Sequence, residues 1–489
     1  MFEEDRDIRP LPPCRSAHSC EEKGVTITPN KLAQPTIAGG ATAAELADLD
    51  RRHLIRSMPN GAVTERVVIV RGEGCTVWDA DDNELLDAAG GGVWHSPIGH
   101  GRRDMAEIAA AQMSRIEFFT SLYEFSNDQA IRLAARLAQL APEGIERVAF
   151  SSGGSEAVET AIKAARLYHH RRGEPDRTWI LARHYAFHGA TYGSGTATGF
   201  PPMQFGVGPN LPHVEKLSPP YLYRADQLYP DQDPTDFLIA ELEETIARIG
   251  AGNIAAMLGE PVMAGAGVLA PPADYWPRVR EVLSRHGILL IADEVVTAPG
   301  RLGEWFMSDK LGMQPDMITM AKGIAGGYAP LGATLMRDEI ADALLRDGGF
   351  FHGYTFQGHP VACALGLATL DIIEREDLLG NARRIAGWLR SGLAPAVDLP
   401  VVGDLRVEGT LAALELISEP VHRTPMGWDQ VIAVAFEVRR AHGVIVRPYG
   451  SNLVLAPPLV LTEAEARRAT AATVEVLRRL HPDGTLAPC

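Results

Sequence analysis

One lysine of this 489-residue chain stands where it can act as a nucleophile rather than as a surface charge. The sequence has six lysines, and arginine supplies most of the positive charge. Lys322 follows the apolar run 317–320 and precedes Gly323, Gly326 and Gly327. A lysine removed from water holds its proton less tightly, so it can condense with an aldehyde to a Schiff base. A solvated charge is the ordinary alternative, and the apolar neighbours argue against it.

Two adjacent carboxylates, Asp293 and Glu294, follow the apolar run 288–292. An ionised carboxylate at that place is costly unless it is paired, and a protonated heterocyclic nitrogen is one partner that keeps it charged. A helix cap and a metal-binding acidic pair are the alternatives. The metal alternative lacks nearby histidines or further carboxylates at ligand spacing, so we expect no metal site.

A turn of small residues at 151–157 follows the strand predicted at 147–150 and runs directly into a helix. Backbone amides can approach an anion at such a turn, and the amino end of the helix adds partial positive charge. The turn therefore suits a phosphate group. A capped strand-to-helix turn without a ligand remains the alternative.

An aromatic residue precedes His-Gly in the segment Phe187-His188-Gly189, after the strand predicted at 179–182. Its ring can lie flat against a planar ligand, and the glycine leaves room for that ligand. The alternative is that Phe187 belongs to the core and His188 is a hydrogen-bonded loop residue.

Five short apolar runs alternate with helical patterns through the middle of the chain, at 147–150, 179–182, 254–258, 288–292 and 317–320. Buried strands separated by helices predict an α/β fold with a parallel sheet covered by helices on both faces. Ligands of such sheets bind beyond the carboxyl ends of the strands. The candidate residues all follow strands, so we expect them to meet there.

The pattern changes near residue 370, where helices at 371–394, 428–442 and 462–480 and strands at 410–416 and 444–446 predict a smaller α+β unit. Alternation at 66–87 predicts a hairpin. We therefore predict an N-terminal extension over 1–50 with room for one short helix, and a hairpin segment over 51–100 that contributes to the small domain. A large domain over 101–370 and the C-terminal small domain over 371–489 complete the division.

Charge and composition exclude several classes of partner. Lys plus Arg number 46 against 62 Asp plus Glu, a net charge of −16 that repels nucleic acid and anionic membranes. Apolar runs fall far short of the ~20 residues that cross a bilayer, and the acidic start is unlike a secretory signal. Five scattered cysteines without a Cys-x-x-Cys pair favour a reducing cytoplasm.

The motifs, in this order, resemble the class III aminotransferases, which are pyridoxal-phosphate (PLP) enzymes of fold type I. The resemblance extends from about residue 67 to the final helix, with further matching segments at 259–263, 300–303, 352–360, 443–448 and 456–459. It implies a large domain with a mostly parallel sheet of seven-stranded type between helices, and a smaller α+β domain. Pro299 departs from the pattern, because it stands where the family commonly has a large aromatic residue.

The resemblance implies a cofactor, PLP, and a role for each matching residue. Lys322 would form the Schiff base with the cofactor, and Asp293 would keep its pyridine nitrogen protonated. The other implied contacts are Gly154 and Ser155 at the phosphate, Phe187 and Val295 on the two ring faces, His188 and Glu260 beside the ring, and Thr355 at the phosphate of the partner subunit. Shared sites of this kind imply a homodimer, or a tetramer built from dimers.

Within the family, the chain is most similar to the ω-amino acid and amine:pyruvate transaminases. Trp94 matches a pocket tryptophan of that branch, Arg447 matches its mobile carboxylate-binding arginine, and Phe187 also faces the substrate. Trp94 as lobe-packing core and Arg447 in a surface ion pair are the alternatives. We therefore expect a transaminase that moves an amino group from an ω-amino acid or amine to a keto acid such as pyruvate.

Other activities on the same scaffold remain open from the sequence. Epimerases, an aminomutase and a decarboxylase share Lys322 and Asp293 and differ in which bond breaks and where the proton returns. A non-catalytic binding protein that keeps the fold is a further alternative, although retention of every expected cofactor residue argues against it.

Overall fold

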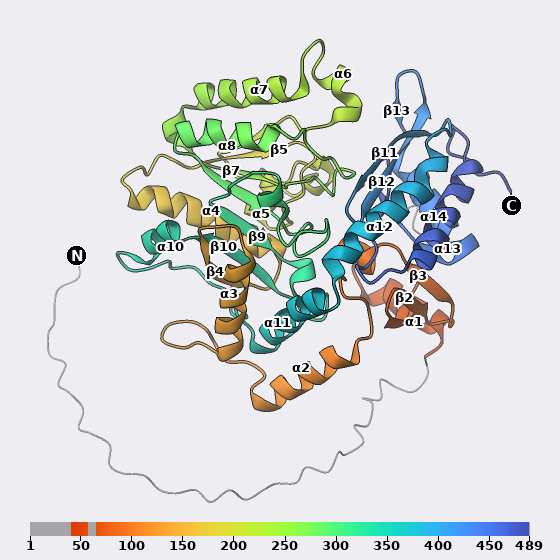
Figure 1. Cartoon of the computed structure of the whole chain (residues 1–489), viewed down its shortest axis with the longest axis horizontal. Coiled ribbons are helices and arrows are strands. Elements are labelled where there is room, and N and C mark those ends of the chain that lie inside the picture. Colours follow the sequence, from red (N-terminus) through yellow and green to blue (C-terminus); the bar gives the residue numbers. More distant parts are fainter. Residues whose placement is uncertain (1–40, 57–64, 489) are drawn as a thin grey trace, which may run out of the picture.

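The computed structural model describes residues 41–56 and 65–488, and a seven-stranded sheet lies within its larger lobe (Figure 1). The strands follow the order β4 (Ile145–Ser151), β10 (Gly332–Arg337), β9 (Met317–Met320), β8 (Leu289–Asp293), β7 (Ile254–Gly259), β5 (Trp179–Arg183) and β6 (Val214–Leu217). Neighbours are parallel except at β10, which runs antiparallel to both β4 and β9. The predicted mostly parallel sheet is confirmed.

The sequence prediction misses two of these strands, β6 and β10. β6 is an edge strand of four residues, and Glu215 and Lys216 give it no apolar run. β10 is buried between two neighbours, but Gly332 and Thr334 weaken its apolar pattern. Both segments become strands because they pair with neighbouring strands, and the residue pattern of one segment does not show that pairing.

Residues of the central strands alternate between two cores, as a pleated strand requires. In β8, Leu290 and Ala292 pack in the core that includes α3 (Asp128–Leu140), α7 (Pro234–Ile249), α8 (Tyr275–Arg285) and α11 (Pro360–Arg375). Leu289 and Ile291 pack in the other, with α4 (Gly154–Arg171) and α10 (Asp338–Leu345). The sheet is covered by helices on both faces, as predicted.

A second, smaller lobe contains the antiparallel strands β11 (Val402–Glu408), β12 (Leu411–Glu419), β16 (Asn452–Leu455) and β15 (Arg447–Tyr449), with β13 (Thr424–Pro425) beside β12. Three helices cover it: α12 (Leu378–Leu393), α13 (Trp428–His442) and α14 (Glu463–Arg478). The predicted hairpin forms β1 (Ile69–Glu73), β2 (Thr76–Asp79) and β3 (Glu84–Asp87), and β14 (Val444–Ile445) pairs parallel with β3. The N-terminal hairpin therefore joins the C-terminal lobe (Figure 1).

The predicted helix over 371–394 is wrong as a single element. α11 ends at Arg375, and α12 begins at Leu378. Between them Asp377 has a left-handed φ of 49°, and its side chain accepts a hydrogen bond from the Gly380 amide. An aspartate in that position caps a new helix, so the periodic pattern continues across a break in the backbone.

The remaining helices are α1 (Ala43–His53), α2 (Arg103–Arg115), α5 (Tyr192–Ala197), α6 (Ala225–Leu228) and α9 (Met307–Lys310). α1 lies at the end of the predicted extension, whose residues 1–40 fall outside the described part of the chain. The predicted boundary at residue 370 falls inside α11, and the division into domains stays a prediction. Over residues 41–56 and 65–488, helices long and apolar enough to cross a membrane are absent.

Candidate functional site

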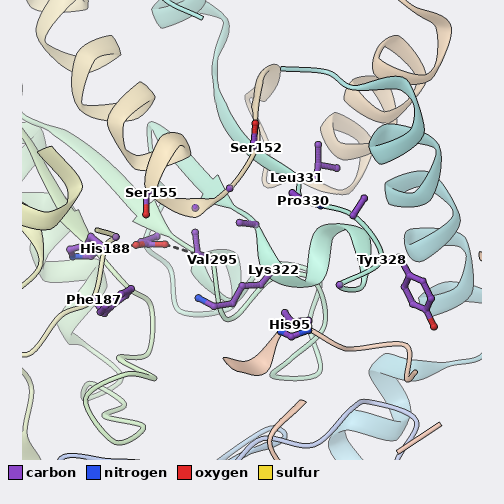
Figure 2. Close-up of a pocket in the computed structure, with 17 residues that line it drawn as sticks. His95, Ser152, Ser155, Phe187, His188, Val295, Lys322, Tyr328, Pro330 and Leu331 are labelled. Carbon is purple, nitrogen blue, oxygen red and sulfur yellow. Dashed lines mark hydrogen bonds and ion pairs between the residues drawn. The ribbon is translucent and has the colours of Figure 1, made fainter. Parts of the chain in front are cut away.

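A cavity of about 410 Å³ opens beyond the carboxyl ends of the strands β4, β5, β8 and β9 (Figure 2). A candidate residue lies at the end of each of the strands β5, β8 and β9 or within four residues of it. Seven residues singled out from the sequence line this cavity: Gly154, Ser155, Phe187, His188, Asp293, Val295 and Lys322. Their separation along the chain shows that the parallel topology brings them together, as predicted.

Lys322 begins a single helical turn directly after β9. Its φ of 45° is left-handed, a conformation that costs a residue with a side chain roughly 1–2 kcal/mol. Figure 2 shows the side chain extended across the cavity, toward the side formed by Phe187 and His188. Burial lowers the pKa of the amine, Asp293 and Glu260 oppose that effect, and Arg301 adds to it. A solvated surface charge is therefore excluded for this lysine.

Asp293 ends β8 and is buried, with protein partners on both carboxylate oxygens. Oδ2 lies 2.7 Å from Nδ1 of His188, and Oδ1 accepts bonds from the Val295 amide at 3.1 Å and the Thr319 hydroxyl at 3.2 Å. Nε2 of His188 is enclosed and has no hydrogen-bond partner among the described residues. Burial lowers the pKa of His188, although Asp293 opposes it. The pair is held rigidly at the cavity wall.

Glu294, the neighbouring carboxylate, serves a different purpose. It accepts hydrogen bonds from the Thr297 hydroxyl and from the amides of Met307 and Ser308, so it holds the loop after β8. The two adjacent side chains diverge, as alternation in extended backbone requires. Among the described residues, clusters of His, Cys, Asp or Glu that could hold a metal are absent.

The small-residue turn begins α4, a helix of 18 residues, at the mouth of the cavity. A Cβ on Gly154 would lie 3.0 Å from Cγ1 of Val295, so a larger residue would crowd the cavity wall. The Ser155 hydroxyl accepts a bond from the Ala190 amide at 3.1 Å, which fixes its position. The amino end of a long helix, lined by Gly154 and Ser155, provides amide donors and partial positive charge for an anion.

A smaller pocket of about 100 Å³ shares Lys322 and Phe187 with this cavity. Trp94, Glu260 and Arg447, all singled out from the sequence, line it. Burial raises the pKa of Glu260 to about 8, while Arg183 opposes this shift and Asp293 adds to it. The structure thus places Glu260 among the residues that line the smaller pocket and not among those that line the larger cavity.

Arg447 lies at the edge of this pocket, where Nη1 donates to the Gly92 carbonyl at 2.9 Å. Burial lowers the pKa of its guanidinium. Trp94 is buried and has a left-handed φ of 67°, at the end of a turn with three positive-φ glycines, Gly90, Gly91 and Gly92. Trp94 and Arg447 thus face one pocket from separate parts of the chain.

Thr355 is the predicted site residue that this chain does not bring to either space. It is exposed, in the segment 350–358, and lines neither the 410 Å³ cavity nor the 100 Å³ pocket. Its assignment to the site of a partner subunit stays a prediction.

Sequence reasoning misses three residues that shape the site, His95, Arg301 and Tyr449. His95 lines the larger cavity, and its ring fills the space where a Cβ on Gly91 or Gly327 would lie. Tyr449 lines the smaller pocket. It lies two residues after Arg447, and strand alternation from that residue would have predicted it.

Arg301 is the third, and it is buried. It donates to the carbonyls of Trp94, Ala456 and Pro457 and to the Thr410 hydroxyl. It thereby ties the backbone of Trp94 to the smaller lobe. The segment 300–303 matches the family, but sequence patterns indicate no role for Arg301, because its hydrogen-bond partners lie more than 100 residues away along the chain.

The chemistry of the cavity fits a phosphorylated pyridine aldehyde. An amine of lowered pKa suits the aldehyde, and the start of α4 suits the phosphate. Phe187 and Val295 provide apolar walls for a ring. A buried carboxylate at Asp293 suits a protonated ring nitrogen.

Comparison with known proteins agrees with this chemistry. Residues 57–477 match the family model for aminotransferase class III. A putrescine–pyruvate aminotransferase from Pseudomonas aeruginosa is 33% identical over 402 residues, 81% of this chain and 87% of that protein. A probable aminotransferase from Mycobacterium tuberculosis is 38% identical over 437 residues, 86% of this chain and 92% of that protein.

Solved structures lead to the same family. An (S)-enantioselective ω-transaminase from Thermomicrobium roseum matches with a TM-score of 0.86 and 40% identity, over 90% of this chain and 99% of that one. A PLP-bound amine transaminase from an uncultivated Pseudomonas species matches with a TM-score of 0.82 and 43% identity, over 86% and 96%. The resemblance found in the sequence motifs is confirmed. The chain is a PLP-dependent enzyme that transfers an amino group from a donor to a keto acid, and it belongs to the class III aminotransferases.

Proposed function

We propose that Lys322 and Asp293 are the catalytic residues and that the 410 Å³ cavity holds PLP. Gly154 and Ser155 would bind its phosphate, Phe187 and Val295 would flank its ring, and His188 and Glu260 would lie beside it. The observation that carries the proposal is the amine of Lys322, with its lowered pKa, in the cavity that the buried Asp293–His188 pair also lines. When bound, PLP supplies an electron sink that makes the C–H bond beside the substrate nitrogen acidic.

Each of these side chains has a defined task in that reaction. Asp293, fixed by three hydrogen bonds, would hold the proton on the pyridine nitrogen. The Lys322 amine would take the proton from the substrate carbon and return it as a general acid. Burial supports the first of these steps, because a lowered pKa favours the neutral amine that must accept the proton.

For substrates, we propose an ω-amino acid or amine donor and pyruvate as acceptor. The smaller pocket beside Lys322 supports this assignment through Arg447, which would bind a carboxylate, and Trp94 and Phe187, which would contact apolar substrate atoms. The relatives of this chain include a putrescine–pyruvate aminotransferase and ω-transaminases, which supports the same assignment.

We also propose a homodimer in which Thr355 reaches the phosphate in the site of the partner. A group of exposed apolar side chains supports this proposal: Met113, Phe119, Tyr123, Phe125, Phe351 and Phe356. Phe356 packs edge-on against Phe118 at 5.2 Å, so the segments that carry this group lie side by side. A second copy of the chain would cover these surfaces.

A cytoplasmic location and the domain division at residues 50, 100 and 370 complete the proposal. Cys75 and Cys363 are buried free thiols, and burial raises the pKa of both, which suits a reducing compartment. The separate apolar cores of the sheet and of the smaller lobe support two domains.

A half-reaction screen tests the proposed function. The PLP-loaded enzyme is mixed with single amines, loss of the cofactor absorbance is followed, and pyruvate is then added. We expect alanine in an amount equal to the cofactor that reacted. Racemised or decarboxylated donor without alanine would contradict transamination and favour another activity of this scaffold.

A further inference from the structure

The smaller pocket contains buried polar atoms that the protein itself leaves without hydrogen bonds. Oη of Tyr449, Nε1 of Trp94 and Oε2 of Glu260 have no hydrogen-bond partner among the described residues. All three side chains are more than nine-tenths buried, and all three line the pocket beside Lys322. An enclosed polar atom without a partner is energetically costly, so these atoms indicate a pocket that a polar ligand completes.

Strand geometry places Tyr449 beside Arg447. Both residues belong to β15, and side chains two residues apart point to the same face of a strand. The tyrosine ring packs on Phe200 with 5.1 Å between ring centroids. The hydroxyl is therefore held at the end of a rigid ring, whereas Arg447 reaches the pocket on a flexible chain.

Arg406 connects the β15–β16 hairpin, which carries Tyr449, to the loop that contains Gly265 and Gly267. β15 pairs with β16, with Tyr449 opposite Asn452, whose Oδ1 accepts from Nη2 of Arg406 at 2.6 Å. Nε of Arg406 donates at 2.6 Å to the carbonyl of Gly267, in the loop that also brings Gly265 to the pocket. This arginine thus links the hairpin to the loop of Gly265, and the two lie side by side where they line the pocket.

The polar groups of the pocket are mainly donors. The Tyr449 hydroxyl, the Trp94 indole N–H and the Arg447 guanidinium all carry N–H or O–H groups, and Glu260, with its pKa near 8, is mostly protonated at neutral pH. A substrate ammonium would meet the positive charge of Arg447, whereas a carboxylate has acceptors for every one of these donors.

We propose that the Tyr449 hydroxyl is a fixed second donor to the substrate carboxylate that Arg447 binds, and that it makes the pocket selective for keto acids over other carbonyl compounds. This inference rests on the proposed function, because it takes pyruvate as the acceptor and Arg447 as its main partner. Arg447 sets the charge preference, and Tyr449 sets where the carboxylate lies.

Tyr449→Phe tests the inference, because it removes the hydroxyl and keeps the ring on Phe200. In the half-reaction with pyruvate, we expect the KM to rise about tenfold with little change in kcat. The KM for propanal, which has the same three carbons and no carboxylate, should change by less than about twofold. Propanoate should bind the PLP-loaded enzyme about tenfold more weakly, as measured by inhibition.

Tyr168→Phe is the matched control. Tyr168 is a buried tyrosine of α4, far from the pocket, whose hydroxyl accepts a bond from Arg172 at 3.0 Å. The control should leave the KM for both acceptors unchanged. An unchanged KM for pyruvate in Tyr449→Phe, or an equal rise for pyruvate and propanal, would overturn the inference while wild-type turnover keeps the proposed function intact. A wild-type enzyme that fails with pyruvate would overturn both.

Discussion

The two spaces that meet at Lys322 differ in how completely their buried polar groups are hydrogen-bonded, although Nε2 of His188 in the larger cavity also lacks a partner among the described residues. In the larger cavity, Asp293 is bonded to His188, to a backbone amide and to a hydroxyl. In the smaller pocket, the polar atoms of Tyr449, Trp94 and Glu260 lack partners among the described residues. A site for a resident group can be organised in advance, whereas a pocket that receives two substrates in turn must leave hydrogen-bonding capacity open.

The largest effect is expected at the residue shared by both spaces. Lys322→Ala removes the amine that would bind the cofactor and move the proton, so kcat should fall at least about 10⁴-fold. Single-turnover kinetics with excess amine would measure it. Lys310→Ala, at an exposed lysine of α9, is the control and should retain wild-type turnover. Borohydride labelling that maps to a peptide without residue 322 would contradict the assignment.

Asp293→Asn tests the role of the hydrogen-bonded carboxylate in the larger cavity. The amide keeps the shape of the side chain but removes the charge that would hold a ring proton, so kcat should fall about 10²–10³-fold. The absorbance of the bound cofactor should also change as its ring loses that proton. Asp309→Asn, at an exposed aspartate of α9, is the matched control. Equal activity of Asp293→Asn and the control would remove Asp293 from the mechanism.

Glu260, in the smaller pocket, should make the free energy of unfolding depend on pH. Its pKa of about 8 in the folded protein exceeds the ordinary 4.5, so between these values the unfolded chain releases the proton that the folded protein keeps. The free energy of unfolding should therefore fall as pH rises through this window, relative to Glu260→Gln, by about a factor of ten in the equilibrium constant per pH unit. Urea unfolding of the cofactor-free protein at several pH values measures it, and parallel curves for both proteins would refute the shift.

Gly265→Ala should have the smallest effect, confined to the substrate pocket. Its Cβ would lie 3.4 Å from Cβ of Phe187 and 3.7 Å from Oη of Tyr449, which are ordinary contacts, so the fold should tolerate it. The methyl group would narrow the 100 Å³ pocket and lower kcat/KM for bulky amines about tenfold, without change in cofactor binding. Gly387→Ala, at an open helical position of α12, is the control. An equal fall in kcat/KM for small and bulky amines would contradict an effect confined to the substrate pocket.

The sequence predicts the organised cavity well because its residues carry local signals. Asp293 and Lys322 directly end or follow apolar strands, and the turn before α4 has its own small-residue pattern. One rule, that ligands bind at the carboxyl ends of parallel strands, is then sufficient to bring them together. The same local signals predict five of the seven strands of the large sheet.

The open pocket is less accessible from sequence because its walls come from pairings across long distances. A role for Tyr449 can be assigned only when β15 is known to lie beside the loop of Gly265. A role for Arg301 can be assigned only when Trp94 and Ala456 are known to be its hydrogen-bond partners. The sequence pattern does not predict strand β10 for a similar reason, because its pairing with β4 and β9 stabilises it. Contacts of this kind depend on the whole fold rather than on the pattern of one segment.

The guanidinium of Arg301 has a consequence for biosynthesis. Its bonds join the Trp94 carbonyl to the carbonyls of Ala456 and Pro457, so the wall that carries Trp94 is complete only when the segment with these two residues has been synthesised and has docked. A chain that stops before these residues would contain the sequence of every strand of the large sheet, but Arg301 would lack two of its partners. The wall that carries Trp94 is thus assembled after all strands of the large sheet have been synthesised.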